Sequence, residues 1–407
     1  MLKRFIADRR GTTAMLFGLA LLPVMGFAGA AVDYGRASNG RAHLQKAIDA
    51  TALALVREAP RASDAELRRK GQALFEAMLK DQRLVAPAPL KVTRTGPAIR
   101  VEGAATMRTA VLGIVGFREL TLESSAESTW GAKKIELALV LDNTGSMASR
   151  NKMQELKAAS HDLLRELRRV ALDADAIRVS IVPFDSHVRI DPGQRHADWL
   201  RFADSAQRAA WTGYVADRDQ PHDAGAARAQ TARPETLYPA ASRTDTDLAR
   251  VRPLTSVVNG YGALTATIDA MKPKGCTNIT IGAAWGLASL AGGEPLPGAT
   301  GGKDVERIMI LLTDGDNTMN RWVNDCTQRG DRARIDARTR AACGEVKGAG
   351  VRLYTIRVIE GNAGLLRDCA SVGADGQPLY YDVQDAARLR PVFQAIVTEI
   401  LGTRLTH

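Results

Sequence analysis

The 407-residue sequence lacks the short motifs that mark many enzymes. It contains no HExxH, no GxSxG and no dinucleotide-binding fingerprint, so no nucleophile–base pair or nucleotide site can be assigned. A Gly-Lys pair at 302–303 resembles the end of a phosphate-binding loop, but Pro297 replaces the first glycine and Asp304 the final Ser or Thr. The four cysteines have no CxxC spacing and the six histidines do not cluster, which argues against zinc. We therefore expect a protein that is not an enzyme.

Aromatic residues are scarce, at 5% of the chain, and the formal net charge of +10 is carried by scattered arginines. Nucleic-acid binding requires clustered basic residues with stacking aromatics, so no nucleic-acid partner is expected. Hydrophobic residues at 45% and charged residues at 25% are ordinary for a globular protein. The length predicts two or three structural units.

Long uncharged runs are also rare, and the longest covers residues 12–32. A helix of this length, at ~1.5 Å per residue, spans a bilayer. Four basic residues precede the run: Lys3, Arg4, Arg9 and Arg10. The positive-inside rule then keeps residues 1–11 cytoplasmic and predicts a single-pass inner-membrane protein with the rest periplasmic or otherwise extracytoplasmic. A cleaved signal peptide is the alternative, since small residues stand at Ala28, Ala30 and Ala31, but its apolar core is usually only ~7–15 residues long.

Residues 33–130 have the pattern of a small helix-plus-strand region. A helical period continues outward from the apolar run, and a second helix is expected over 64–79 with Asp64 as its cap. The stretch 90–130 alternates apolar and polar residues between glycine breaks, which predicts strands.

From residue 134 to 407, apolar strands alternate with amphipathic helices. This alternation predicts an α/β fold with a doubly wound, mostly parallel sheet covered on both faces. Strands are expected at 134–142, 176–184, 306–315 and 351–359, and helices at 152–167, 281–292, 332–350 and 385–402. Residues 189–252 interrupt the pattern and contain few aliphatic side chains, so we expect a long insertion that is disordered in part.

Polar side chains follow two of these strands where each strand ends. Asp142, Thr144 and Ser146 follow one strand, Asp314 follows another, and Thr277 lies in a third loop before a helix. Capping a helix needs only one such oxygen. Because the carboxyl ends of parallel strands meet at one edge of a sheet, the three loops should converge. Two carboxylates and three hydroxyls form a hard-oxygen site suited to Mg²⁺ or Mn²⁺.

The order of these five residues resembles the pattern D-x-[ST]-x-S, then Thr, then Asp, of von Willebrand factor type A domains. In that family the pattern forms the metal-ion-dependent adhesion site (MIDAS), and the resemblance covers about residues 134–407. It implies that Thr144, Ser146 and Thr277 bind the metal directly, while Asp142 and Asp314 bind partly through water. It also implies an open coordination position for an acidic side chain of a protein partner.

A second resemblance runs along nearly the whole chain. The segments RRGTTAM and VDYGRASNGRAHLQKAIDATALAL near the N-terminus, and GCTNITIGAAWG and LRDCASVG downstream, are similar to TadG-like proteins of the tight-adherence (Tad/Flp) pilus system. This implies a component of a pilus-assembly apparatus whose partner is another assembly component or a pilin. The alternatives are a surface or secreted adhesin and, less favoured without a catalytic constellation, a metal-dependent hydrolase.

The even number of cysteines predicts two disulfides in an exported domain, with three connectivities to choose from and buried free thiols as the alternative. Cys276 and Cys326 both fall near the loops of the expected metal site. Cys343 and Cys369 fall on either side of the strand expected at 351–359. We therefore expect the pairs Cys276–Cys326 and Cys343–Cys369, since bridging requires Cα atoms within ~7 Å.

Overall fold

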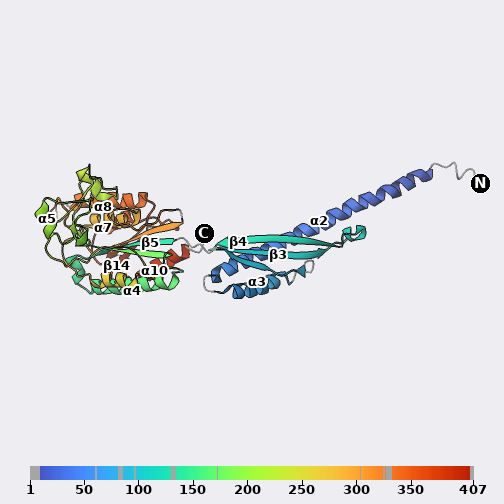
Figure 1. The fold of residues 1–407 in the computed structure, drawn as a ribbon, viewed down its shortest axis with the longest axis horizontal. Helices are drawn as coiled ribbons and strands as arrows, with labels where there is room; N and C mark the ends of the chain where they lie inside the picture. Colours follow the sequence, from blue (N-terminus) through green and yellow to red (C-terminus); the bar gives the residue numbers. More distant parts are fainter. Residues whose placement is uncertain are drawn as a thin grey trace, which may run out of the picture. The chain divides into compact units, whose positions relative to one another are not determined.

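The computed structural model describes residues 10–59, 62–80, 86–95, 98–129, 134–171, 173–302, 304–323, 326 and 332–403. The chain divides into two compact units, Met1–Gly131 and Ala132–His407. Figure 1 colours both units along the sequence.

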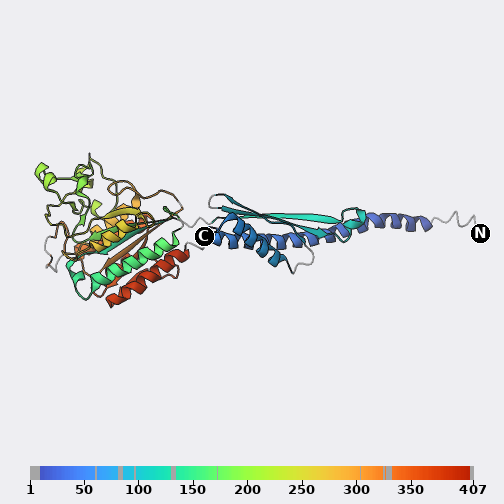
Figure 2. The same cartoon turned by 60° about the horizontal axis from the view of Figure 1, so that its bottom comes forward.

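The first unit packs two helices on one face of an antiparallel sheet (Figures 1 and 2). The helices are α2 (Arg10–Glu58) and α3 (Asp64–Leu79), and the strands are β1 (Ala86–Pro87), β2 (Lys91–Thr95), β3 (Ala98–Arg108) and β4 (Glu119–Thr129). Strand β3 pairs with each of the other three. The predicted helix over 64–79 is confirmed, but its cap is Ser63, whose hydroxyl accepts the Glu66 N–H while the Glu66 carboxylate accepts the Ser63 N–H.

The core of this unit follows from helical and strand periodicity. Along α2, Leu44, Ile48 and Leu55 recur at helical spacing and are buried. Ile99 and Val101 alternate along β3 toward the same cluster.

The membrane prediction for the N-terminal segment is corrected by the structure. The run over 12–32 lies in the 49-residue helix α2, which continues through Asp33 into the part packed on the sheet, as the outward helical period predicted. None of the helices, taken over the residues described, combines the length and apolar character needed to cross a bilayer. The predicted transmembrane span, and with it the single-pass inner-membrane location, is therefore wrong.

The second unit is built on a mostly parallel sheet, as the alternating pattern predicted. Its parallel strands, in spatial order, are β14 (Tyr380–Val383), β13 (Arg352–Val358), β12 (Val305–Thr313), β5 (Lys134–Asp142) and β6 (Ile177–Phe184). Beyond β6 the pairing is antiparallel, through β7 (Val188–Arg189), β9 (Tyr214–Val215) and β11 (Arg252–Ser256).

Helices cover both faces of this sheet, which makes the unit mixed α/β (Figure 1). One layer contains α4 (Lys152–Val170), α6 (Tyr261–Asp269) and α10 (Leu389–Thr403), and the other contains α7 (Ile279–Ala291), α8 (Arg332–Gly348) and α9 (Ala363–Cys369). Along β5, Leu139 and Leu141 point to the first layer, and Ala138 and Val140 to the second. A strand buried on both faces needs a near-continuous apolar run, which is why β5 was readable from the sequence.

The insertion over 189–252 is described throughout and folded, in contrast to the expected partial disorder. It contributes short elements such as β8 (Leu200–Arg201), α5 (Ser205–Ala210) and β10 (Tyr238–Pro239). Its aromatic side chains replace the missing aliphatics: Trp199 and Tyr238 are buried, and the Tyr238 ring lies 5.2 Å from that of Trp285 on α7. Edge-to-face packing of this kind anchors a segment without a periodic pattern.

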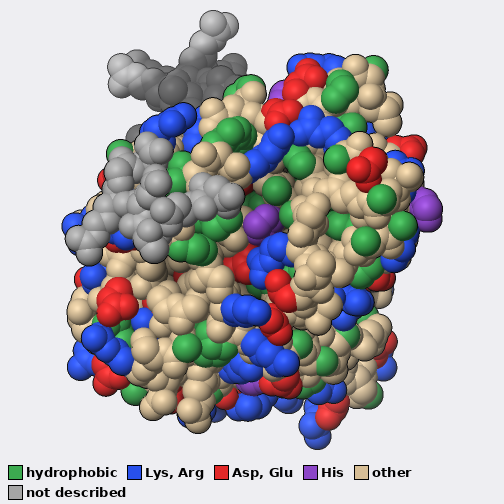
Figure 3. Space-filling view, turned by 90° about the vertical axis from the view of Figure 1, so that its left-hand side faces the viewer, with side chains coloured by type: hydrophobic (Ala, Val, Ile, Leu, Met, Phe, Trp, Pro, Cys, Tyr) green, Lys and Arg blue, Asp and Glu red, His purple; other side chains and the backbone are tan. Residues whose placement is uncertain are grey.

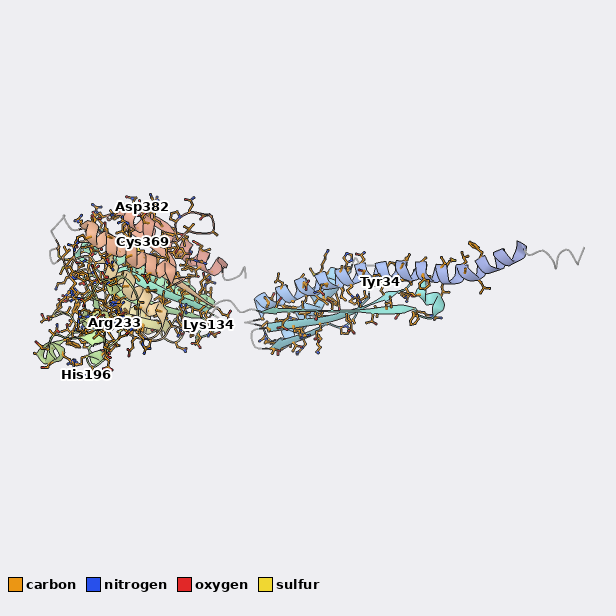
Figure 4. All side chains as sticks on the ribbon, turned by 90° about the horizontal axis from the view of Figure 1, so that it is seen from above. Tyr34, Lys134, His196, Arg233, Cys369 and Asp382 are labelled. Atoms are coloured by element: carbon orange, nitrogen blue, oxygen red, sulfur yellow. A yellow bond between two sulfur atoms is a disulfide. The ribbon has the colours of Figure 1, made fainter. Side chains whose placement is uncertain are left out.

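Both predicted disulfides are present. Cys276 and Cys326 are bonded with their Cα atoms 5.6 Å apart. Cys343 of α8 is bonded to Cys369 of α9 with a Cα separation of 5.1 Å, and both residues are buried in the second helical layer (Figure 4 labels Cys369).

Candidate metal centre

Two neighbouring strands bring the predicted aspartates together. In the parallel pair β5–β12, Leu141 lies opposite Leu312, so the two strands end side by side. Asp142 is the last residue of β5, and Asp314 follows the last residue of β12. Both carboxylates are fully buried at this edge of the sheet.

The loop that carries Thr277 is fastened to both of the other loops. The N–H of Gly145 donates to the Gly275 carbonyl at 3.0 Å. The N–H of Thr277 donates to the hydroxyl of Thr318 at 2.9 Å, and the N–H of Thr318 donates back to the Thr277 carbonyl at 2.9 Å. The position of Thr277 is therefore fixed by backbone contacts before any ligand is considered.

The oxygens of the first and third loops are in direct contact. The Ser146 hydroxyl donates to Asp314 Oδ1 at 2.6 Å, and the Thr144 and Ser146 hydroxyl oxygens are 3.0 Å apart. Asp142 is bound on both sides, since Oδ1 accepts the Thr144 N–H at 2.8 Å and Oδ2 accepts the Thr313 hydroxyl at 2.5 Å. Ser146 is exposed, so the cluster opens to solvent at this residue.

The hydroxyls of Thr277 and Ser146 both lie close to Gly315. A Cβ at Gly315 would lie 3.2 Å from Thr277 Oγ1 and 3.6 Å from Ser146 Oγ. The structure thus brings all five predicted residues to one place: Asp142, Thr144, Ser146, Thr277 and Asp314.

The two buried carboxylates of the cluster, Asp142 and Asp314, act on each other electrostatically. Burial, with the charge of Asp314 as the next cause, raises the pKa of Asp142 to about 7, against the hydrogen bonds from Thr144 and Thr313. Asp314 Oδ2 is buried without a regular hydrogen bond among the described residues and lies against the ammonium of Lys152. A buried carboxylate oxygen of this kind needs a positive charge beside it, which a metal ion could also supply. Among the described residues no three His, Cys, Asp or Glu side chains cluster as metal ligands, so the fit depends on the hydroxyls as well as the two carboxylates.

Two charged residues at this site were missed by the sequence analysis. Lys152, the first residue of α4, has a fully buried side chain whose ammonium contacts Asp314 Oδ2. The same ammonium lies 3.3 Å from Glu360 Oε2, in the loop after β13. A lysine at the start of an amphipathic helix is normally solvated, and Glu360 lies more than 200 residues away in sequence, so no local pattern could have indicated this pair.

A cleft of about 610 Å³ adjoins the Thr277 loop. Its basic side chains are already paired: Arg243 with Asp185 at 2.7 Å, Lys274 with Asp247 at 2.6 Å, and Arg321 with Asp219. Figure 3 shows one end of this unit, on which basic and acidic side chains are interspersed. The cleft therefore offers a polar surface without a single dominant charge.

Comparison with protein families identifies the N-terminal segment. Residues 11–57, which lie entirely in α2, match the family described as putative Flp pilus-assembly TadE/G-like. This confirms the resemblance that the RRGTTAM segment indicated. Among curated proteins no sequence matches the chain.

Solved structures with a similar arrangement include pilus proteins. The pilus adhesin SpaC from Lactobacillus rhamnosus GG is 14% identical, with a TM-score of 0.41 over 78% of this chain and 34% of that one, so this chain spans about a third of its length. The vWF domain of the type V pili tip protein Mfa5 from Porphyromonas gingivalis is 10% identical, with a TM-score of 0.38 over 66% of this chain and 96% of that one.

A third structure is that of proximal thread matrix protein 1 from the mussel byssus, with a zinc-occupied MIDAS motif. It is 14% identical, with a TM-score of 0.35 over 65% of this chain and 47% of that one. At these identities and TM-scores, the structural likenesses carry no argument about what this chain binds.

Proposed function

We propose that this chain, which carries a TadE/G-like pilus-assembly segment at residues 11–57, acts in a Tad/Flp-type pilus system by binding a protein partner through a divalent metal ion. The ion, Mg²⁺ or Mn²⁺, is held by Asp142, Thr144, Ser146, Thr277 and Asp314. The observation that carries the proposal is the convergence of these side chains. The Ser146 hydroxyl contacts Thr144 and Asp314, Ser146 and Thr277 both lie close to Gly315, and the buried Asp314 Oδ2 already has a cation, the Lys152 ammonium, beside it.

Each residue has a distinct part in such a site. The hydroxyls of Thr144, Ser146 and Thr277 provide neutral oxygen ligands, which hard cations accept. Asp142 already accepts hydrogen bonds on both oxygens, which suits a position one water away from the ion. Bound metal supplies a positive centre that an acidic side chain of the partner can coordinate. The exposure of Ser146 gives that side chain access from solvent.

The proposal describes a binding protein and requires no reacting group. A pilus-assembly component or a pilin that presents an Asp or Glu side chain is the partner that this chemistry favours. Because the partner's carboxylate would bind to the metal ion itself, removal of the metal would release the partner.

Metal titration of the full chain by calorimetry tests the proposal, with Asp314→Asn compared to Asp316→Asn. Asp316 is two residues further along the same loop, is part-exposed, and pairs with Arg332 at 2.7 Å, so it provides a matched control. We expect Mn²⁺ or Mg²⁺ binding in wild type and in Asp316→Asn, and a loss of about tenfold or more in Asp314→Asn.

The same variants should be compared for partner capture with and without a chelator, with circular dichroism as the folding check. Equal behaviour of the two aspartate variants, or no metal binding by wild type, would contradict the ligand assignment.

A further inference from the structure

Lys152 places a positive charge inside the candidate metal centre. Its side chain is fully buried, and its ammonium contacts Asp314 Oδ2, an oxygen without a regular hydrogen bond among the described residues. A buried ammonium is expensive to maintain unless it is paired, and a buried carboxylate likewise. In this structure each of the two groups therefore neutralises the other, and the Asp314 oxygen available to a metal ion is covered by a cation of the chain itself.

A second carboxylate lies within reach of the same ammonium. Glu360 Oε2 is 3.3 Å from Lys152 Nζ, and the Glu360 side chain is half exposed. Arg150 Nη1 lies 3.6 Å from the other oxygen of Glu360, Oε1. Lys152 thus lies between two acids, one inside the site and one at its rim, and a small rotation of its side chain would shift its charge from the first to the second.

The backbone around this pair is held in an unusual conformation. Within the described part of the chain, the residues other than glycine with positive φ are Arg150 at 54°, Asn151 at 56° and Ile359 at 64°. The first two directly precede Lys152 and the third directly precedes Glu360. Asparagine tolerates this left-handed backbone, but in Arg150 and in the β-branched Ile359 it is costly and persists where the surrounding structure enforces it. Strained backbone near Lys152 and directly before Glu360 therefore helps to set the direction of both side chains.

The loop of Glu360 is also packed directly on the metal loop. Gly361 approaches so closely that a Cβ there would lie 2.9 Å from the carbonyl oxygen of Gly315. The Glu360 loop is thus a fourth element of the site, beside the three that carry the candidate ligands.

We propose, building on the proposed metal-binding function, that Lys152 is a tethered counter-ion that competes with the divalent cation for Asp314 and is received by Glu360 when the cation binds. The competition weakens metal affinity and keeps the buried acids neutralised in the absence of metal. Glu360 strengthens metal affinity because it offers the displaced ammonium a partner. Two like charges at one carboxylate repel strongly in a buried site, so the cation cannot bind until the ammonium moves.

The test is Mn²⁺ titration of the full chain by calorimetry, with Lys152→Met, Glu360→Gln and the double variant. Lys157→Met is the control, since Lys157 lies on the same helix but donates to the Asp269 carbonyl at 2.9 Å, away from the site. We expect Lys152→Met to bind Mn²⁺ about tenfold or more tighter than wild type, because the competing charge is gone. Lys157→Met should match wild type. Thermal unfolding in chelator should show Lys152→Met less stable than wild type.

Glu360→Gln tests the proposal even if Lys152→Met does not fold. The Glu360 side chain is half exposed, so this substitution leaves the core intact. We expect this variant to bind Mn²⁺ several-fold more weakly than wild type. In the Lys152→Met background the same change should have little effect, since no ammonium remains to be received. Unchanged or weaker binding in Lys152→Met, or an equal effect of Glu360→Gln in both backgrounds, would overturn the proposal. If wild type binds no Mn²⁺, the proposed function fails. In that case, Mn²⁺ binding by Lys152→Met would still support competition between the Lys152 ammonium and the cation. No Mn²⁺ binding by this variant would refute that competition.

Discussion

The N–H of Gly145 donates to the carbonyl oxygen of Gly275 at 3.0 Å, and this bond joins the loop of Asp142 to the loop of Thr277. Gly275 has a φ of +93°, and a Cβ on it would lie 2.8 Å from Asp185 Oδ2. Asp185 is itself buried and paired with Arg243 at 2.7 Å, so it cannot easily move aside. The approach of the two loops therefore depends on the absence of a side chain at one position.

Gly275→Ala should separate these loops. We expect the alanine to strain a left-handed backbone and displace Asp185, which lowers the thermal midpoint and weakens Mn²⁺ binding about tenfold. The control is Gly262→Ala in α6, where nothing lies within 4 Å of the added Cβ. That variant should be as stable as wild type or more stable, by up to about 1 kcal/mol. Unchanged metal affinity in Gly275→Ala would show that the loops are not positioned by this contact.

The disulfide Cys343–Cys369 joins two helices of one layer over a sequence separation of 26 residues. Replacing both cysteines with alanine should lower the free energy of unfolding by about 2–4 kcal/mol, because the unfolded chain loses a cross-link. Urea unfolding of the two proteins under non-reducing conditions measures this. Mn²⁺ affinity should not change, since neither cysteine belongs to the candidate site. A double alanine variant with the stability of wild type would refute the expectation.

The disulfide Cys276–Cys326, in contrast, is expected to affect metal affinity at the candidate site. Cys276 directly precedes Thr277, so the cross-link restrains a loop that carries a candidate ligand. The variant lacking both cysteines should bind Mn²⁺ more weakly than the Cys343–Cys369 variant does. Calorimetry on the two variants side by side distinguishes a role in the site from a general loss of stability, which would affect both.

The sequence predicted the parts of this fold that depend on burial and on strand ends. Strand β5 was readable because Leu139 and Val140 face different helical layers and both must be apolar. The closeness of Asp142 and Asp314 was readable because both stand at the ends of neighbouring parallel strands, whereas Thr277 precedes a helix and was included through the family resemblance. The Lys152–Glu360 pair was not, because its members meet only through tertiary packing. The long N-terminal helix was readable from its helical period, but an uncharged run of sufficient length did not by itself predict a membrane span correctly.

Burial of His187 is expected to make the free energy of unfolding depend on pH. Burial, with the nearby charge of Arg243 as the next cause, lowers the pKa of His187 to about 4. Between that value and the ordinary histidine pKa near 6.5, the unfolded state binds more protons than the folded state, so stability rises with pH across this window. Asp217 acts in the opposite direction, since burial raises its pKa to about 6 and stability falls with pH between 3.8 and 6.

His187→Gln should therefore flatten the rise in stability between pH 4.5 and 7, by at most about 3 kcal/mol. Denaturant unfolding at several pH values measures the slope. His196→Gln, at an exposed position labelled in Figure 4, is the control and should leave the profile as in wild type. If both variants keep the wild-type slope, another group controls the pH dependence.

Asp33 fixes the tip of the β3–β4 hairpin against α2. Its carboxylate is fully buried and accepts three backbone N–H groups, from Ala110 at 2.7 Å, Val111 at 2.9 Å and Leu112 at 2.8 Å. These bonds, the one from Leu112 first, lower the pKa of Asp33 below its ordinary value of 3.8. The stabilisation they give is present above that ordinary value and is lost as the pH falls through the lowered one.

Asp33→Asn should release the hairpin tip, because an amide has one acceptor oxygen and turns its NH₂ group toward donors that need an acceptor. We expect faster hydrogen exchange at the amides of residues 110–112 and a lower thermal midpoint, with little change at the amides of β5 in the other unit. Asp49→Asn is the matched control: Asp49 lies on the same helix, is exposed, and among the described residues accepts only from Gln45 Nε2, at 2.7 Å. Exchange at residues 110–112 that is equally slow in wild type and in Asp33→Asn would show that the tip is held by the apolar contacts of Val111 and not by the carboxylate.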